Sequence, residues 1–169
     1  MIAAIDVHYR ETFAKAVGVL FNWEDEQPQQ TLTVICNDID EYVPGEFYKR
    51  ELPCILRILE QIDISSLEAL LVDGHVYTDN NKKMGLGGHL YNELKGVIPV
   101  IGVAKTSFYT NAATVVPVYQ GESKKPLFVS AIGMDVVTAA DKVKEMKGSY
   151  RMPFILKRTR FHYQKRLKT

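Results

Sequence analysis

The sequence predicts an α/β fold in which a mixed sheet, three antiparallel strands followed by parallel strands, is flanked by helices. Three strand-like segments joined by short polar connections come first along the chain. An amphipathic helix follows them, and short apolar runs then alternate with helical segments. The chain has 169 residues, of which 46% are hydrophobic and 24% charged, so its length and composition are those of one compact globular domain.

The three early segments, residues 2–9, 12–21 and 31–36, are rich in apolar and β-branched side chains. Residues 10–11 form a short polar turn between the first two, as in a hairpin. The loop 22–30 is too short to contain a crossover helix. Antiparallel pairing of the third strand is therefore favoured.

The later elements are a helix with Pro53 in its first turn, two buried parallel strands that enclose a second helix, a hairpin and a last amphipathic helix. In chain order they are predicted at residues 52–62, 68–73, 86–95, 97–104, 115–119, 127–131 and 134–146. This order is that of the RNase H-like fold, and other mixed α/β folds share parts of it. We expect one such domain over residues 1–169, with a basic C-terminal tail from about residue 155.

Cys36 and Cys54 lie in apolar surroundings without metal-ligand spacing, which favours two reduced core thiols over a disulfide. No run approaches the roughly 18 apolar residues of a membrane span. The start of the chain has too short an apolar run for a signal peptide. We therefore expect a cytoplasmic protein without a membrane partner, and a monomer.

The charge of the chain is divided unequally. Residues 1–100 carry 8 Lys and Arg against 16 Asp and Glu, whereas residues 101–169 carry 13 against 4. Residues 157–168 contain six basic side chains and no acid. This tail is compatible with phosphate binding, and equally with a solvated helix end that has no partner.

Three carboxylates occupy positions where chemistry is expected. Asp6 interrupts a strand with two apolar faces, where a carboxylate must be paired with a nearby Arg or bound to a metal. Asp73 ends an apolar run, and open α/β sheets place ligand sites at such strand ends. Glu51 precedes the helix start, where an acid also favours the helix dipole. If the three converge, their oxygen atoms suit Mg²⁺ or Mn²⁺.

Two further residues lie near these carboxylates in the predicted sheet. Lys105 ends the next apolar run, at the same edge as Asp73, and can meet a phosphate as a point charge. His8 shares the face of Asp6. For His8, a hydrogen-bonded sheet histidine is favoured over a neighbour of the metal.

Five segments resemble motifs of the endonuclease V family. Residues 42–53, YVPGEFYKRELP, closely resemble its signature, a YxPG turn that leads to an RE-x-P helix start. The others are AIDVHY at 4–9, VDGH at 72–75, GLGGHL at 85–90 and IGVAKT at 101–106. One such motif would be weak, but five in the family's order are specific.

The resemblance implies a metal-dependent endonuclease that hydrolyses a phosphodiester bond in DNA or RNA near deaminated purines, above all inosine. The products would carry 3′-hydroxyl and 5′-phosphate ends. Asp6, Glu51 and Asp73 would hold Mg²⁺, with Mn²⁺ as the other candidate. Lys105 would contact a phosphate near the cleaved bond. The late segment RTRFH at 158–162 makes His162 the candidate for the family's histidine beside the metal.

The resemblance also implies how a damaged base is bound. Tyr42, in the turn with Pro44 and Gly45, would belong to the wedge that separates the strands. Gly74 and the adjacent His75 would line the pocket for the flipped base, which is read by hydrogen bonds and stacking.

The chain departs from the family after VDGH. Family members continue with Gly-x-x-His-Pro-Arg, whereas residues 76–84 read VYTDNNKKM. Two other interpretations therefore stay open: a nuclease of relaxed or structure-specific substrate choice, and a non-catalytic nucleic-acid-binding module. Three costly buried carboxylates argue against the binding module.

Overall fold

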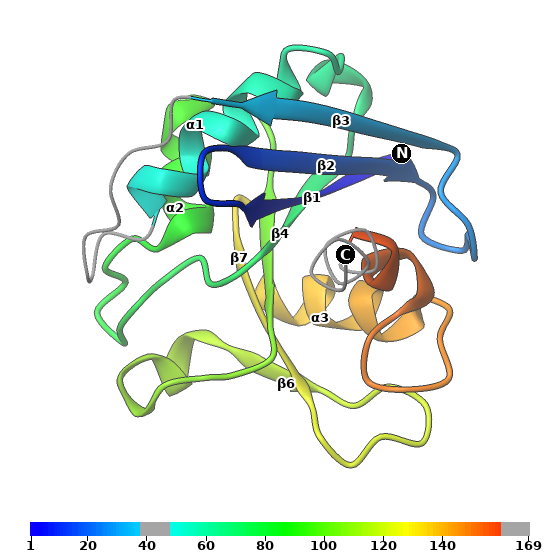
Figure 1. The fold of residues 1–169 in the computed structure, drawn as a ribbon. Coiled ribbons are helices and arrows are strands. Elements are labelled where there is room, and N and C mark those ends of the chain that lie inside the picture. Colours follow the sequence, from blue (N-terminus) through cyan, green and yellow to red (C-terminus); the bar gives the residue numbers. More distant parts are fainter. Residues whose placement is uncertain (38–47, 160–169) are drawn as a thin grey trace.

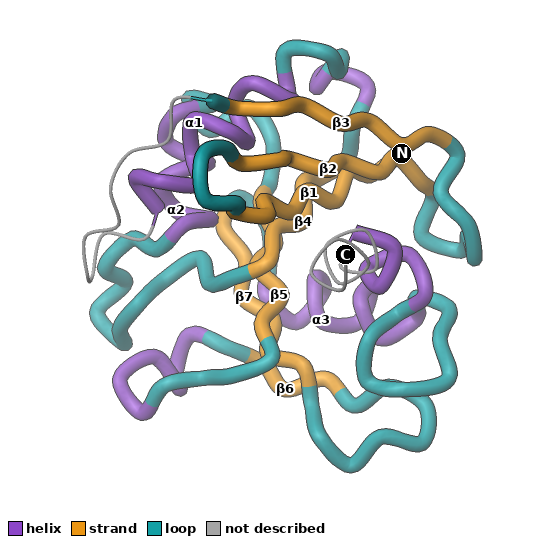
Figure 2. The backbone as a smooth tube through the Cα atoms, in the orientation of Figure 1, coloured by secondary structure: helices purple, strands orange, loops and turns teal. Residues whose placement is uncertain are grey.

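The computed structural model describes residues 1–37 and 48–159 and contains the predicted mixed sheet. Its seven strands lie in the order β3-β2-β1-β4-β5-β7-β6 (Figures 1 and 2). The strands are β1 (Ile2–Tyr9), β2 (Ala14–Phe21), β3 (Gln30–Cys36), β4 (Ala69–Asp73), β5 (Val100–Ala104), β6 (Val116–Val118) and β7 (Leu127–Ile132). The three early strands pair antiparallel, as predicted.

Helical elements cover both faces of the sheet. They are α1 (Tyr48–Leu59), η1 (Ile64–Ser66), α2 (Leu86–Glu93), η2 (Tyr109–Thr114) and α3 (Val136–Glu145). Helices α1 and α2 pack on one face, while α3 and a helical turn at residues 154–159 pack on the other (Figures 1 and 2). No helix in the described ranges is long and apolar enough to cross a membrane.

Strand β1 lies in the middle of the sheet, as its two apolar faces predict. It pairs antiparallel with β2 and parallel with β4. Ile5 lies opposite Val72 in the parallel pair. Since paired residues on parallel strands point to the same face, the next step in the register brings Asp6 beside Asp73.

Alternate residues of β1 contribute to two separate cores. Ala3 and Ile5 face the core formed with α1 and α2. Ala4 faces the core formed with α3 and residues 155–156. Alternation therefore directs Asp6 toward the side of the sheet that α3 covers.

Helix α1 differs from its prediction. It begins earlier than expected, at Tyr48, and ends at Leu59. Pro53 is therefore inside the helix, and the prediction that it occupies the first turn is wrong. Glu51 is the acidic residue of that first turn instead. A proline this close to the helix start removes few backbone hydrogen bonds, so the helix continues through it.

The hairpin of β6 and β7 was predicted, and its antiparallel pairing is confirmed. The sequence did not indicate where this hairpin joins the sheet. Strand β7 pairs antiparallel with β5 and separates it from β6. The ends of β1, β4 and β5 thus remain together at one edge of the sheet, where the candidate site residues lie.

Candidate active site

Asp6 lies near the carboxyl end of β1, and its side chain is 14% exposed. Its Oδ1 accepts a hydrogen bond from the backbone N–H of Val7 over 2.9 Å. Its Oδ2 lies 3.9 Å from Nε2 of His8. The carboxylate is therefore held in the second half of β1, directly after the last residue that pairs with β4, within a partly buried polar group.

Asp73 is the last residue of β4 and is half-buried. Together with Asp6 and Thr159, it lines a small cavity between the sheet and the last helical turn. Gly74 follows with a φ of +145°, which L side chains rarely adopt, so glycine permits the chain to leave the strand here. The register and this shared cavity bring the two aspartates together.

Glu51 reaches the aspartates from α1, which packs on the opposite face of the sheet. Its side chain is buried, at 8% exposure. Burial, followed by the charges of Asp6 and then Asp73, raises the pKa of Glu51 to about 8, while the neighbouring Arg50 opposes the rise. The three predicted carboxylates therefore lie close enough for their charges to interact.

The side chains of these three carboxylates do not have the coordination geometry of a metal site. Within residues 1–37 and 48–159, no group of three or more His, Cys, Asp and Glu side chains has the arrangement of a metal site. Their chemistry nevertheless fits a hard divalent cation, because all three are oxygen donors and the buried Glu51 is destabilised by its acidic neighbours. A cation would offset that repulsion.

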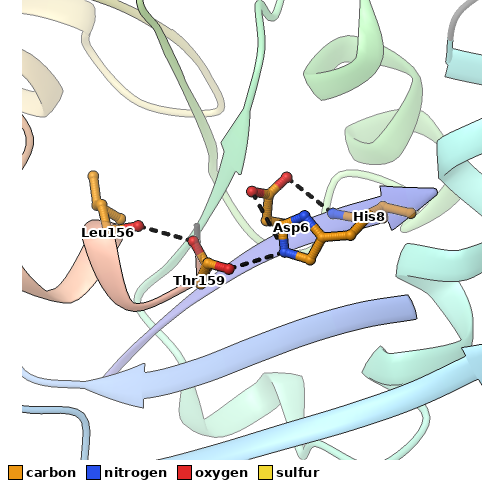
Figure 3. A network of polar contacts seen from close by, with 5 residues as sticks. Asp6, His8, Leu156 and Thr159 are labelled. Carbon is orange, nitrogen blue, oxygen red and sulfur yellow. Dashed lines mark hydrogen bonds and ion pairs between the residues drawn. The ribbon is translucent and has the colours of Figure 1, made fainter. Parts of the chain in front are cut away.

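His8 is hydrogen-bonded, as its favoured interpretation predicts (Figure 3). Its Nε2 donates to the Thr159 carbonyl over 2.9 Å, and the Thr159 hydroxyl donates to the Leu156 carbonyl. Burial lowers the pKa of His8 to about 4, so the ring is neutral at physiological pH. This hydrogen bond joins β1 to the last described helical turn beside Asp6.

A cavity of about 700 Å³ opens on the other side of Asp73. Its size is within the usual range of small-ligand sites, roughly 300–1,000 Å³. The residues that line it are Tyr48, Asp73, Gly74, His75, Thr78, Lys83, Met84, Gly85, Leu86, His89, Ala104, Lys105, Thr106 and Phe108. Three predicted site residues, Gly74, His75 and Lys105, are thus beside Asp73 in one cavity.

Aromatic rings form part of the cavity wall. Tyr48 of α1 and His89 of α2 stack with 3.6 Å between ring centroids and 18° between planes. Phe108, half of whose surface is exposed, lies 5.5 Å from the His75 ring. Nε2 of His75 donates to the Thr106 carbonyl over 2.8 Å, and burial lowers the pKa of this histidine. The wall is therefore suited to flat, uncharged groups.

The segment 76–84, where the chain departs from the family motif, is an ordered turn. Tyr77 bridges to Met84, and the N–H of Thr78 donates to the Lys83 carbonyl over 2.8 Å. Asp79 accepts hydrogen bonds from two backbone N–H groups within the turn. Thr78, Lys83 and Met84 all reach the cavity, so the unusual sequence contributes directly to its wall.

A fully buried asparagine docks this turn onto η2. Nδ2 of Asn111 donates to the Tyr77 carbonyl over 3.2 Å, and its Oδ1 accepts from the backbone N–H of Phe108 over 2.8 Å. The Asn111 side chain thus holds both the turn at residues 76–84 and Phe108 in place. Sequence reasoning missed Asn111, Phe108 and Tyr48, because nothing local distinguishes them from ordinary polar or packing residues.

Four predicted site residues lie outside the described ranges. They are Tyr42, Pro44 and Gly45 of the predicted wedge, and His162 of the tail. Their roles stay predictions.

The family model of Endonuclease V matches residues 1–159 of the chain. The curated endonuclease V of Nostoc punctiforme is 27% identical over 173 residues, which cover 90% of this chain and 76% of that protein. The endonuclease V of Xylella fastidiosa is 34% identical over 108 residues, 62% of this chain and 43% of that protein.

Solved structures share the fold over nearly the whole chain. The structure of Ciona intestinalis endonuclease V with a DNA that contains an inosine followed by a ribo-adenosine has a TM-score of 0.80 at 19% identity, covering 99% of this chain and 85% of that one. Bacillus subtilis endonuclease V has a TM-score of 0.78 at 18% identity, covering 99% and 80%. The predicted RNase H-like fold is confirmed by this likeness.

Proposed function

This chain belongs to the endonuclease V family, and on that premise we propose that it cleaves nucleic acid near deaminated purines, with inosine as the preferred lesion. As a family member it is an endonuclease, a phosphodiester hydrolase. The observation that carries the proposal is the gathering of Asp6, Glu51 and Asp73 beside a cavity of base-accommodating size. The inosine-containing DNA bound to the Ciona intestinalis protein supports the choice of lesion.

Asp6, Glu51 and Asp73 would together hold the divalent cation, with Mg²⁺ as the first candidate and Mn²⁺ as the second. Each supplies carboxylate oxygens, the donors that both ions prefer. Such a cation stabilises the negative charge that develops on a phosphodiester as it is hydrolysed. His8 is neutral and donates to a backbone carbonyl, so in our proposal it supports the site and does not bind the cation.

Lys105 is the proposed contact to the substrate phosphate. It directly follows β5 and lines the cavity with Asp73. A lysine at this edge adds a positive charge beside the three carboxylates, which favours approach of the polyanionic strand. In the tail, His162 is proposed as a further residue beside the cation.

The cavity is the proposed site of the flipped base. Gly74 and His75 line it next to Asp73, and its aromatic wall is suited to stacking a purine. Tyr42, with Pro44 and Gly45, is proposed to fill the gap that the base leaves in the duplex. Deaminated DNA and deaminated RNA are both candidate substrates, and the enzyme is proposed to act as a monomer.

A second candidate function follows from the turn at residues 76–84. Three cavity residues, Thr78, Lys83 and Met84, come from this turn, where the family motif is absent. The nuclease chemistry can thus be kept while the recognised base or structure differs. Under this alternative, undamaged single-stranded or branched nucleic acid is cleaved as fast as inosine-containing nucleic acid.

A single-turnover cleavage assay separates these functions. Matched DNA and RNA oligonucleotides, with and without one inosine, are incubated with Mg²⁺, Mn²⁺ or EDTA. We expect cleavage that requires a metal, prefers inosine and leaves 3′-hydroxyl and 5′-phosphate ends. Equal rates on undamaged strands support the alternative, and binding without cleavage under all conditions contradicts the enzyme proposal.

A further inference from the structure

Few buried side-chain polar atoms in the described structure lack a hydrogen-bond partner, and those few lie around one site. They are the Tyr9 hydroxyl, Nε of Arg50 and Nδ1 of His75. Arg50 directly precedes Glu51, and His75 lies two residues after Asp73. Buried polar groups are normally satisfied, so unpaired ones concentrated beside three carboxylates call for an explanation.

Tyr9 is the most informative of the three. It is the last residue of β1, and its ring packs in the core beneath α1. The guanidinium of Arg50 lies over this ring, with its Cζ 4.0 Å from the ring centroid. Burial, followed by the charge of Glu51, raises the pKa of Tyr9. Tyr9 and Glu51 are therefore close enough to interact electrostatically, and the arginine that precedes Glu51 lies over the Tyr9 ring, while the Tyr9 hydroxyl makes no hydrogen bond in the described structure.

We propose that Tyr9 is a positioning residue for Glu51, whose carboxylate accepts a hydrogen bond from the Tyr9 hydroxyl when it holds the divalent cation. Arg50 holds the ring through its stacking contact. The inference rests on the proposed function, because it takes Glu51 as a cation ligand. It adds a residue whose effect is exerted through Glu51 and not by contact with the substrate.

The test depends on whether the Tyr9 hydroxyl has no hydrogen-bond partner or donates to the Glu51 carboxylate, because the two arrangements have different effects on stability and on cation binding. A buried hydroxyl without a partner destabilises a fold, and its removal is neutral or stabilising. A hydroxyl that orients a metal-binding carboxylate strengthens cation binding, and the loss of such a partner typically weakens affinity about 10–100-fold. A purely structural tyrosine cannot produce both effects in the same variant.

Tyr9→Phe is the direct test, with Tyr91→Phe as its matched control. Tyr91 packs in the same core, but it contacts Gly96 and Gly133 at the far end of β5 from Lys105. Thermal unfolding of the full chain is followed in EDTA and then across a Mn²⁺ titration without nucleic acid. We expect Tyr9→Phe to unfold at the same or a higher temperature in EDTA, and to require about tenfold more Mn²⁺ for half of the stabilisation.

Cleavage of the inosine oligonucleotide is then measured against Mn²⁺ concentration. For Tyr9→Phe we expect slow cleavage at low Mn²⁺ that recovers at high Mn²⁺, whereas Tyr91→Phe follows the wild type. An unchanged Mn²⁺ midpoint, or a clear loss of stability in EDTA, overturns the inference. Failure of the wild type to cleave any strand contradicts the proposed function instead, and the Mn²⁺ midpoints still decide the role of Tyr9.

Discussion

Asp6 and Asp73 directly follow Ile5 and Val72, the last pair in the register of two parallel strands, and the buried Glu51 reaches them from a helix on the opposite face. Burial, followed by the negative charges of Asp6 and Asp73, raises the pKa of Glu51. The residues that give the site its chemistry therefore reduce the stability of the fold. A bound cation reverses that penalty, since anything that binds only the folded state stabilises it.

Glu51→Gln is expected to stabilise the protein in EDTA at alkaline pH. The folded pKa of Glu51, about 8, lies above its ordinary value of 4.5, so between these values the folded state binds more protons than the unfolded state. The contribution of Glu51 to the free energy of unfolding is therefore fully present below pH 4.5 and is lost as the pH rises through 8. Glutamine removes this loss, with an expected gain of roughly 2–4 kcal/mol at pH 8 and little at pH 4.5.

Urea denaturation of both proteins in EDTA at pH 4.5 and pH 8 measures this gain. A gain of equal size at both pH values would mean that glutamine packs better, and that the charge of Glu51 has no part in the effect. The same variant should lose most of its stabilisation by Mn²⁺.

Asp73→Asn is expected to abolish cleavage and to leave the fold intact. The change removes the negative charge of a proposed cation ligand but almost preserves the shape of the side chain. We expect a loss of at least about two orders of magnitude in the single-turnover rate. Asp141→Asn, on the exposed surface of α3, is the matched control and should cleave normally. Normal cleavage by Asp73→Asn would exclude this residue from the catalytic centre.

Among the elements, the site depends on parallel strands whose carboxyl ends lie at the same edge of the sheet. Strands β1, β4 and β5 run parallel, so their carboxyl ends meet at one edge of the sheet. Asp6, Asp73 and Lys105 are positioned by this arrangement. The close fit of β5 against the chain that leaves β4 then fixes the position of Gly74 and His75.

Gly102→Ala is expected to disturb this fit. A Cβ on Gly102 would lie 2.6 Å from the Gly74 carbonyl oxygen and 2.7 Å from the Ser130 hydroxyl, so the chain after Asp73 must move. Overpacking of this kind typically costs about 1–3 kcal/mol, and we also expect slower cleavage because Gly74 and His75 shift. Denaturation and single-turnover rates measure the two effects.

Gly18→Ala supplies the comparison within the same sheet. Its added Cβ would meet only side chains, the nearest being the end of Ile58 at 3.1 Å. This substitution should leave the cleavage rate unchanged at a small cost in stability. If both substitutions slow cleavage equally, the effect comes from general destabilisation and not from the position of Gly74.

At the scale of the whole molecule, acidic and basic residues are separated along the chain. The three site carboxylates belong to the acidic first part, and 13 of the 21 Lys and Arg belong to residues 101–169. Thr159 lines the small cavity with Asp6 and Asp73, so the basic tail continues from a point beside the site. A positive segment there would contact the phosphates of a strand bound at the carboxylates.

Replacement of Arg158, Arg160, Lys165 and Arg166 with Gln is expected to weaken nucleic-acid binding and to reduce its salt dependence. Each lost phosphate contact should lower the slope of log affinity against log salt by about 0.9 on duplex DNA. Fluorescence anisotropy in EDTA at several salt concentrations gives the slope. Lys124, Lys125, Lys142 and Lys144, all exposed, form the matched control set of equal charge. If the tail variant and the wild type have the same slope of log affinity against log salt, the tail does not contact the phosphates.

Local patterns in the sequence were enough to predict the elements and the candidate chemistry. Alternating and helical hydrophobic patterns are local, and they located every strand and the principal helices, with errors mainly at the ends, as at Pro53. The three carboxylates and Lys105 were recognisable because they belong to short motifs. Only the three-dimensional structure shows that Glu51 meets Asp6 and Asp73 from the opposite face and that β7 joins β5. It also shows that Tyr48 and Phe108 line the cavity, and that Asn111 holds the turn at residues 76–84 in place. These features depend on burial and on contacts between distant segments, which no local pattern encodes.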